Sequence, residues 1–232
     1  MTLHMVQMRQ EYHDQLAQIE RQTLSGLDLV VVAIDRALEA LREHDVELAS
    51  VVVADDDRID GRYLETHQAI LSLLALQAPV AGDLRVVAAL LHVIRHVERM
   101  GDQCVTVAKM VPLDGAEPVC DGLLIDRIMR MGGLVRAQVL QAQRAFGERD
   151  VALAEELVTL DREVNALNKE IFARAVTIGD DPELREWAMH MTLVSRCLER
   201  IGDNAVDIGE QTAFVVTGLF REFSDASEIR HR

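Results

Sequence analysis

The stretch that decides the fold is Glu98-Arg-Met-Gly-Asp102, because it recurs as Glu199-Arg-Ile-Gly-Asp203, 101 residues further on. An earlier segment repeats as well, since Asp56-Asp-Arg-Ile-Asp60 matches Asp161-Arg-Glu-Val-Asn165. Self-similarity at a fixed spacing is typical of duplicated structural units. The chain is therefore interpreted as two similar units, each of roughly 110 residues.

The composition favours helices throughout. The 232 residues include only 4 prolines and 3% aromatic residues, and 49% are hydrophobic. No proline interrupts residues 1–78, where Leu27, Ile34 and Leu41 recur every seven residues in a helical stripe. Valine runs at 30–32 and 51–53 lie inside these helical patterns. The predicted fold is all-α, with six long helices that form two tandem three-helix bundles. The first bundle is expected at 1–111 and the second at 122–220, joined by a linker at 112–121 and followed by a charged, frayed tail at 221–232.

The charge balance excludes several classes of function. Lys and Arg number 24 against 39 Asp and Glu, which gives a net charge of −15. Binding to nucleic acid or to anionic lipid needs clustered basic residues, so neither is expected. Three cysteines without a C-x-x-C spacing indicate a reducing compartment. The N-terminus has no apolar signal region, and Thr66 to Gly82 is too polar to span a bilayer. We expect a cytoplasmic protein without direct membrane insertion.

Acidic residues at helical spacing are the candidate functional residues. Residues at i, i+4 and i+8 share one face of a helix. In the second half these positions hold Glu199, Asp203 and Asp207. In the first half they hold Glu98, Asp102 and Thr106, so the third acid is missing there. Asn165 likewise replaces a carboxylate on the second helix of the second half. Carboxylates are hard ligands that suit Fe, Zn, Mn, Mg or Ca. The candidate metal ligands are Asp56, Asp60, Glu98, Asp102, Asp161, Glu199, Asp203 and Asp207.

Internal salt bridging is the alternative interpretation of these acids. Arg95 and Arg99 flank Glu98 and Asp102 at helical spacing, as Arg196 and Arg200 flank the second copy. Gly101 and Gly202 stand beside the acids within helices, which indicates either close helix packing or access to the backbone. His92 and His96 have no counterpart in the second half, so they are expected to be surface or interhelix residues.

No enzyme motif accompanies the acids. The sequence has no Gly-rich phosphate loop, no G-x-S-x-G and no convincing nucleophile–base set, so we do not expect an enzyme. A carboxylate-bridged di-metal oxidase is the second hypothesis, but the Glu-x-x-His pairs of such bundles are represented only by Glu228 and His231 in the tail. A purely structural helical dimer with salt-bridged acids is the third.

The chain resembles the PhoU family of phosphate-signalling regulators over about residues 8 to 220. The resemblance rests on Leu73-Leu-Ala-Leu-Gln-Ala-Pro-Val-Ala-Gly-Asp-Leu-Arg85, on Glu98 to Lys109, on Leu198 to Glu210 and on Val215-Val-Thr-Gly218. Two copies of Glu-x-x-x-Asp with matched surroundings are a specific signal. Gln77-Ala78 departs from the more usual Arg-Gln before the proline.

The resemblance implies a non-enzymatic cytoplasmic adaptor. Such a protein couples a high-affinity phosphate ABC transporter to a sensor histidine kinase and silences the kinase when phosphate is plentiful. Its implied partners are the ATPase subunit of the transporter and the kinase, and it would associate with the membrane through them. Family members commonly dimerise, and some carry iron or other metal ions on the acidic columns. Because Thr106 and Asn165 interrupt the pattern, two full metal clusters are not expected.

Overall fold

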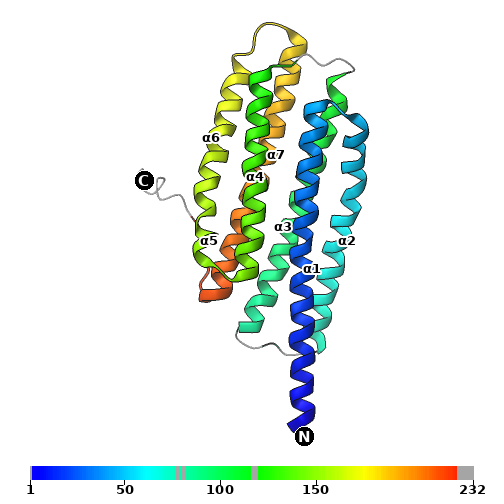
Figure 1. The fold of residues 1–232 in the computed structure, drawn as a ribbon, viewed down its shortest axis with the longest axis vertical. Helices are drawn as coiled ribbons and strands as arrows, with labels where there is room; N and C mark the ends of the chain where they lie inside the picture. Colours follow the sequence, from blue (N-terminus) through cyan, green and yellow to red (C-terminus); the bar gives the residue numbers. More distant parts are fainter. Residues whose placement is uncertain (1, 77–78, 80–81, 116–119, 224–232) are drawn as a thin grey trace.

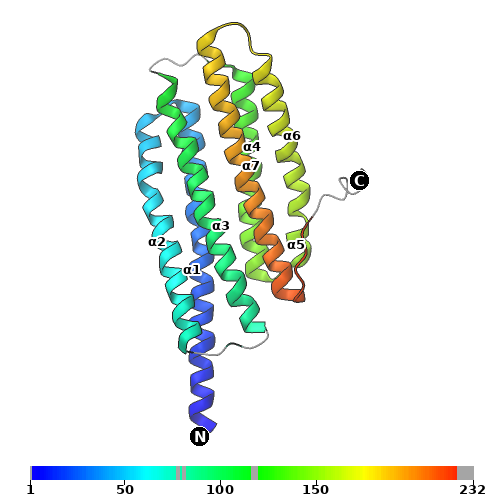
Figure 2. The same ribbon diagram turned by 180° about the vertical axis from the view of Figure 1, so that it is seen from behind.

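The computed structural model describes residues 2–76, 79, 82–115 and 120–223, and every regular element in these ranges is a helix. The first bundle contains α1 (Thr2–Glu43), α2 (Val46–Leu76) and α3 (Gly82–Met110), followed by a short 3₁₀ turn, η1 (Val111–Asp114). The second contains α4 (Gly122–Glu148), the single-turn α5 (Val151–Glu155), α6 (Leu157–Val176) and α7 (Pro182–Thr217). The predicted all-α fold with six long helices in two bundles is confirmed, and Figures 1 and 2 show it from opposite sides.

Aspartates begin several of these helices. The carboxylates of Asp45, Asp150 and Asp181 accept hydrogen bonds from backbone N–H groups in the first turns of α2, α5 and α7. These three helices therefore begin directly after a capping aspartate, and η1 adds a short helical turn where the linker was predicted to begin. An N-cap side chain that accepts a hydrogen bond from a backbone N–H of the first turn stabilises a helix by about 1 kcal/mol.

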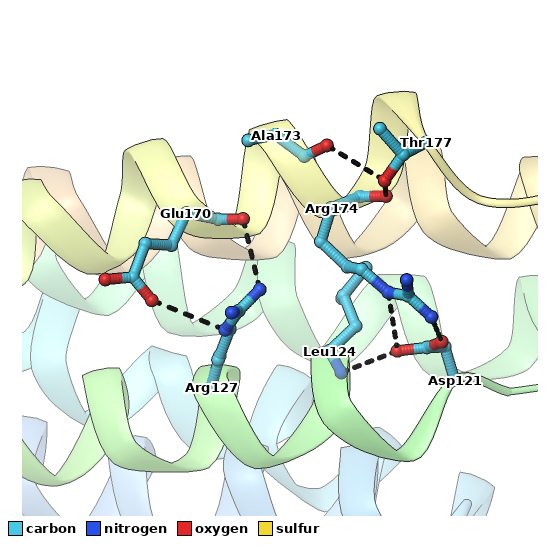
Figure 3. Close-up of polar contacts among 7 residues, drawn as sticks. All are labelled: Asp121, Leu124, Arg127, Glu170, Ala173, Arg174 and Thr177. Carbon is cyan, nitrogen blue, oxygen red and sulfur yellow. Dashed lines mark hydrogen bonds and ion pairs between the residues drawn. The ribbon is translucent and has the colours of Figure 1, made fainter.

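The N-cap of α4 also ties that helix to the end of α6 (Figure 3). Asp121 accepts the N–H of Leu124 at 2.9 Å and pairs with Arg174. The hydrogen bond from the Arg174 guanidinium is the main reason that the pKa of Asp121 is lowered. One turn further along, Arg127 lies 3.4 Å from the Glu170 carboxylate. These contacts hold the first and second long helices of the second bundle together at one end.

The two bundles meet through equivalent helices, since α3 packs along α7 and α1 packs along α4. Cross-bundle contacts join Asp35 to Arg136, Asp28 to Gln143 and Glu20 to Arg149, each at 2.8 Å. Residue numbers fall along α1 as they rise along α4, so the paired helices are antiparallel, as the colours in Figure 1 show. This arrangement is a pseudo-twofold repeat.

A continuous apolar core fills both bundles and the interface between them. Leu90, Ile94 and Met100 of α3 and Met191 and Ile201 of α7 are at most 1% exposed. Burial of such side chains supplies most of the folding free energy. The valine runs at 30–32 and 51–53 lie in α1 and α2, as expected, and Val30 and Val52 are buried. Among the described helices, none combines the length and apolarity needed to cross a bilayer.

The end of the described chain differs from the expected frayed tail. Phe223 packs beside α7, where its backbone N–H donates to Glu210 Oε1 at 2.6 Å. Residues 224–232, including Glu228 and His231, lie outside the described residues.

Candidate functional site

Four of the predicted ligands gather on neighbouring faces of α2 and α3. Asp60, Asp102 and Glu98 all act on Asp56 electrostatically, and each raises its pKa. We call Asp56, Asp60, Glu98 and Asp102 the first acidic patch. The i, i+4 spacing on both helices brings the four carboxylates to one level because α2 and α3 pack side by side.

Burial and mutual repulsion leave this patch electrostatically unsatisfied. Burial is the main reason that the pKa of Asp56 rises to about 6, and the neighbouring carboxylates add to it. Burial likewise raises the pKa of Glu98, against the opposing charge of Arg95. Glu98 Oε1 lies 3.3 Å from the Arg95 guanidinium, whereas Oε2 is buried and has no hydrogen-bond partner. A cation would lower the free energy of such a cluster more than of an isolated surface carboxylate.

Gly101 permits the close approach that forms the patch. A Cβ atom at this position would lie 2.9 Å from Asp56 Oδ1 and 3.0 Å from Ile59 Cδ1. A small pocket of about 20 Å³ borders Asp56, Ile59 and Gly101, and it has room for about one water molecule. The geometry fits the close-packing alternative, because Asp56 and Ile59 occupy the space that a Cβ atom would need.

The second acidic patch consists of Asp161, Glu199 and Asp203. Partial burial is the main reason that the pKa of Asp203 is raised, and repulsion by Asp161 adds to it. Asp161 Oδ2 accepts from the Asn165 amide at 2.7 Å, and Asp161 Oδ1 accepts from the Gln138 amide at 3.3 Å. Glu199 forms an ion pair with Arg196. Asp161 is thus held by amides of the protein itself, whereas Gln138 Oε1 and Glu199 Oε2 are buried without a hydrogen-bond partner, as Glu98 Oε2 is in the first patch.

Gln138 is a site residue that the sequence analysis missed. It is fully buried on α4, and its Oε1 would lie 2.7 Å from a Cβ atom at Gly202. A lone glutamine within a helical stripe gives no spacing signal. The one available clue is that a polar residue stands among the apolar positions of α4 that face the core.

Asp207 and Thr106 show how the two halves diverge. The sequence predicts Asp207 as the third acid of a metal column, yet its carboxylate lies 3.6 Å from His96 Nδ1 on the other bundle. His96 also contacts Asn204 Oδ1 at 2.7 Å, so His96 is an interhelix residue, as expected. Thr106 Oγ1 donates to the Asp102 carbonyl of its own helix.

The first patch has four carboxylates and the second has three, and Asp60, Asp102 and Glu98 each act electrostatically on Asp56. Carboxylate oxygens are the donors that a hard cation prefers. Throughout the described part of the chain, however, no three His, Cys, Asp or Glu side chains are placed to hold a metal ion. A cation at the first patch would therefore require the carboxylates to rotate toward it. Metal binding stays a prediction.

An open pocket of about 520 Å³ runs beside the second patch. It lies between α6 and α7, with Asp161 and Glu199 on its wall and Phe223 at its edge. Asn165 and Lys169 of α6 also line it. We call this pocket the α6–α7 groove.

Comparison with known proteins gives one consistent family. The family model described as "PhoU domain" matches twice, at residues 24–111 and 128–212. The chain is 29% identical over 221 residues to the "Phosphate-specific transport system accessory protein PhoU homolog 1" of Mycobacterium leprae, covering 93% of this chain and 96% of the relative. It is 30% identical to "PhoU homolog 2" of Mycobacterium tuberculosis, covering 92% and 100%. The crystal structure of PhoU from Pseudomonas aeruginosa has a TM-score of 0.83 and 27% identity, covering 90% of this chain and 100% of that one.

Proposed function

The chain belongs to the PhoU family, and from that premise we propose that it is a cytoplasmic regulatory adaptor of phosphate homeostasis. It couples a high-affinity phosphate ABC transporter to a sensor histidine kinase and restrains both phosphate uptake and the phosphate-starvation response. The observation that carries this proposal is the duplicated PhoU domain with an acidic patch in each copy.

A role without catalysis agrees with the family. The relatives are named accessory proteins of a phosphate-specific transport system, and the chain is not an enzyme. The oxidase hypothesis is not favoured, because such a site needs a Glu-x-x-His pair from each of two helices and the sequence contains one, Glu228 and His231.

Charge complementarity supports docking to basic partner surfaces. A net charge of −15 and two carboxylate patches attract positive segments and speed their encounter. The proposed partners are the ATPase subunit of the transporter and the kinase, which would hold the protein at the membrane surface. A homodimer is the proposed oligomeric state. Iron or another hard cation at the first patch would reduce the repulsion among Asp56, Asp60, Glu98 and Asp102.

The partner proposal is tested by co-purification with the ATPase subunit. Tagged wild-type protein should retain the subunit from detergent-solubilised membranes of the native host. The double variant Glu98→Gln, Asp102→Asn removes two charges from the first patch and should retain several-fold less. The matched control is Glu163→Gln, Glu186→Gln, which removes two exposed charges from α6 and α7 outside both patches.

Either of two results would contradict the proposed docking: no ATPase subunit with the wild-type protein, or equal loss with both double variants. Circular dichroism and sedimentation would establish that each variant remains folded and keeps the oligomeric state of the wild type.

A further inference from the structure

Four large apolar side chains are exposed on α6 and α7, near the turn at 177–181 that joins the two helices. They are Phe172, Val176, Met189 and Leu193, and each is between 52% and 71% exposed. Phe172 and Val176 are one turn apart on α6, as Met189 and Leu193 are on α7. Single exposed apolar residues are normal, whereas a contiguous group marks an interaction site. We call these four residues the apolar face.

The apolar face occupies one level of the second bundle. α6 and α7 are antiparallel neighbours, and Ser195 Oγ of α7 donates to Asn168 Oδ1 of α6 at 2.9 Å. Four residues further along α6, Phe172 is level with the residue four positions before Ser195. Val176 is level with the residue eight positions before it, so Met189 lies between these two levels. The exposed side chains of the two helices are therefore neighbours across the helix pair.

The apolar face also lies on one side of the helix pair. The α6 residues that line the α6–α7 groove recur every three or four positions, and Phe172 and Val176 continue the same column. α7 is covered by α3, α4 and α6, so its exposed side chains, Met189 and Leu193 among them, share the side that these helices leave open. α6 forms the edge of the molecule farthest from α2, as Figures 1 and 2 show.

The first bundle has no equivalent of this surface. With α2 aligned on α6 and α3 on α7 as the repeat dictates, the apolar face corresponds to His67, Leu71, Ala88 and His92. Two histidines and an alanine do not make a contiguous group of large apolar side chains. A surface that occurs once in a chain and pairs with its own copy closes a twofold dimer and does not extend into a filament.

The exposed charges beyond the two ends of the apolar face differ in sign. Toward the middle of the helices, three basic residues outnumber Glu199: Lys169, Arg196 and Arg200. Toward the turn, three acidic residues outnumber Arg185: Asp180, Asp181 and Glu183. If two copies pack with α7 antiparallel to α7, the basic end of each meets the acidic end of the other. Two chains of net charge −15 repel each other, so local complementarity of this kind is what self-association needs.

We propose that the apolar face is a self-association surface through which two copies of this chain form a closed dimer. The twofold axis runs perpendicular to α6 and α7, so each of these helices lies antiparallel against its own copy. The proposal rests on the homodimer of the proposed function and deepens it by assigning the contact surface. Because α6 lies at the edge opposite α2, the dimer leaves the first acidic patch of each copy free for a partner.

Sedimentation equilibrium of the full chain tests the proposal. The wild type should be a dimer at micromolar concentration. Val176→Glu places a charge in the contact, so the dissociation constant of the dimer should rise about tenfold or more, and Met189→Glu should act in the same way. The matched control is Leu71→Glu, which adds the same charge at the corresponding exposed residue of the first bundle and should leave the constant unchanged.

The charges at the two ends give a second readout. Lys169→Glu should weaken the dimer several-fold, because the end that it alters then meets an acidic end. Adding Asp180→Lys should restore the affinity toward that of the wild type, since the two ends have then exchanged charge. Circular dichroism would establish that each variant remains folded.

A monomeric wild type would overturn the proposal, and so would a dimer that Val176→Glu leaves intact or that Leu71→Glu weakens equally. A monomer whose Val176→Glu variant loses the ATPase subunit in co-purification would assign the apolar face to that partner instead. Sedimentation requires neither a partner nor phosphate signalling. A dimer lost in Val176→Glu, in a chain without effect on phosphate genes, would refute the adaptor and keep the surface, whereas normal regulation by a monomer would refute the surface alone.

Discussion

His96 Nδ1 and Asn204 Oδ1 lie 2.7 Å apart across the interface where α3 of the first bundle meets α7 of the second. His96 is 8% exposed, and its burial lowers its pKa, although the hydrogen bond with Asn204 and the charge of Asp207 oppose that shift. A buried imidazole needs its polar partner, because an unsatisfied ring nitrogen keeps the full cost of desolvation. The pair therefore contributes to the angle and register at which the two bundles join.

Asn204→Ala should destabilise the protein by about 1–2 kcal/mol, since it leaves His96 without its closest partner. Urea unfolding at pH 8 measures the change, and Gln103→Ala is the matched control at the equivalent position of α3. Equal stability of Asn204→Ala and wild type would mean that water or another side chain replaces the amide.

The two glycines beside the acids should respond differently from glycines in open helix. Gly101→Ala should cost about 1–2 kcal/mol, because the new Cβ atom would crowd Asp56 and the buried Ile59. Gly202→Ala should cost at least as much, since Gln138 is buried and close. A Cβ atom at Gly61 would meet nothing within 4 Å, so Gly61→Ala should stabilise α2 by up to about 1 kcal/mol. Denaturant midpoints of the three variants decide the matter, and a stabilising Gly101→Ala would refute the close approach of α2 and α3.

Asp56 should make the stability of the protein depend on pH. Its pKa in the folded protein is about 6, above the ordinary 3.8, so the folded state binds the proton more tightly than the unfolded state. Stability should therefore rise as the pH falls through about 6, and ionised Asp56 should cost stability above that pH. Asp56→Asn should stabilise the protein at pH 8 by about 1 kcal/mol, after allowance for solvent screening at a half-buried site.

The measurement is urea unfolding at pH 8 and pH 4 in the presence of a chelator, so that no bound cation offsets the repulsion. The advantage of Asp56→Asn should disappear at pH 4, and Glu163→Gln should show no such change. A destabilised Asp56→Asn at pH 8 would contradict the repulsive patch.

If the protein binds a hard cation, the first patch should be the principal site. The first patch has four carboxylates, whereas the second has three and its Asp161 already accepts from the amides of Asn165 and Gln138. Calorimetric titration with Mn²⁺ should therefore lose most of its signal in Glu98→Gln, Asp102→Asn and keep most of it in Glu199→Gln, Asp203→Asn. The reverse order would assign the site to the second bundle.

The sequence was sufficient for the fold but only for part of the site. The repeat of Glu98 to Asp102 predicted two bundles. Helical periodicity and internal repetition can both be recognised in the sequence itself, without knowing how the helices pack against one another. The contribution of Gln138 and the pairing of His96 with Asn204 depend on how separate helices meet. Asp207 illustrates the limit, since its i+8 spacing is correct for a column on one helix while its carboxylate lies beside His96 of the other bundle.

The return of the chain after α7 was equally beyond prediction. The charged residues after 220 favoured a frayed end, and a single aromatic residue such as Phe223 has no periodicity. Its docking depends on Gly209 and Glu210, which stand near the end of α7 and become adjacent to Phe223 only after the chain reverses at Gly218.

The most direct test of the proposed function is alkaline phosphatase activity in phosphate-replete cells of the native host, with and without the gene for this chain. Deletion should raise the activity several-fold, and complementation with the wild-type gene should restore the low level, because a negative regulator of the starvation response has been removed. Unchanged low activity in the deletion strain would contradict that role.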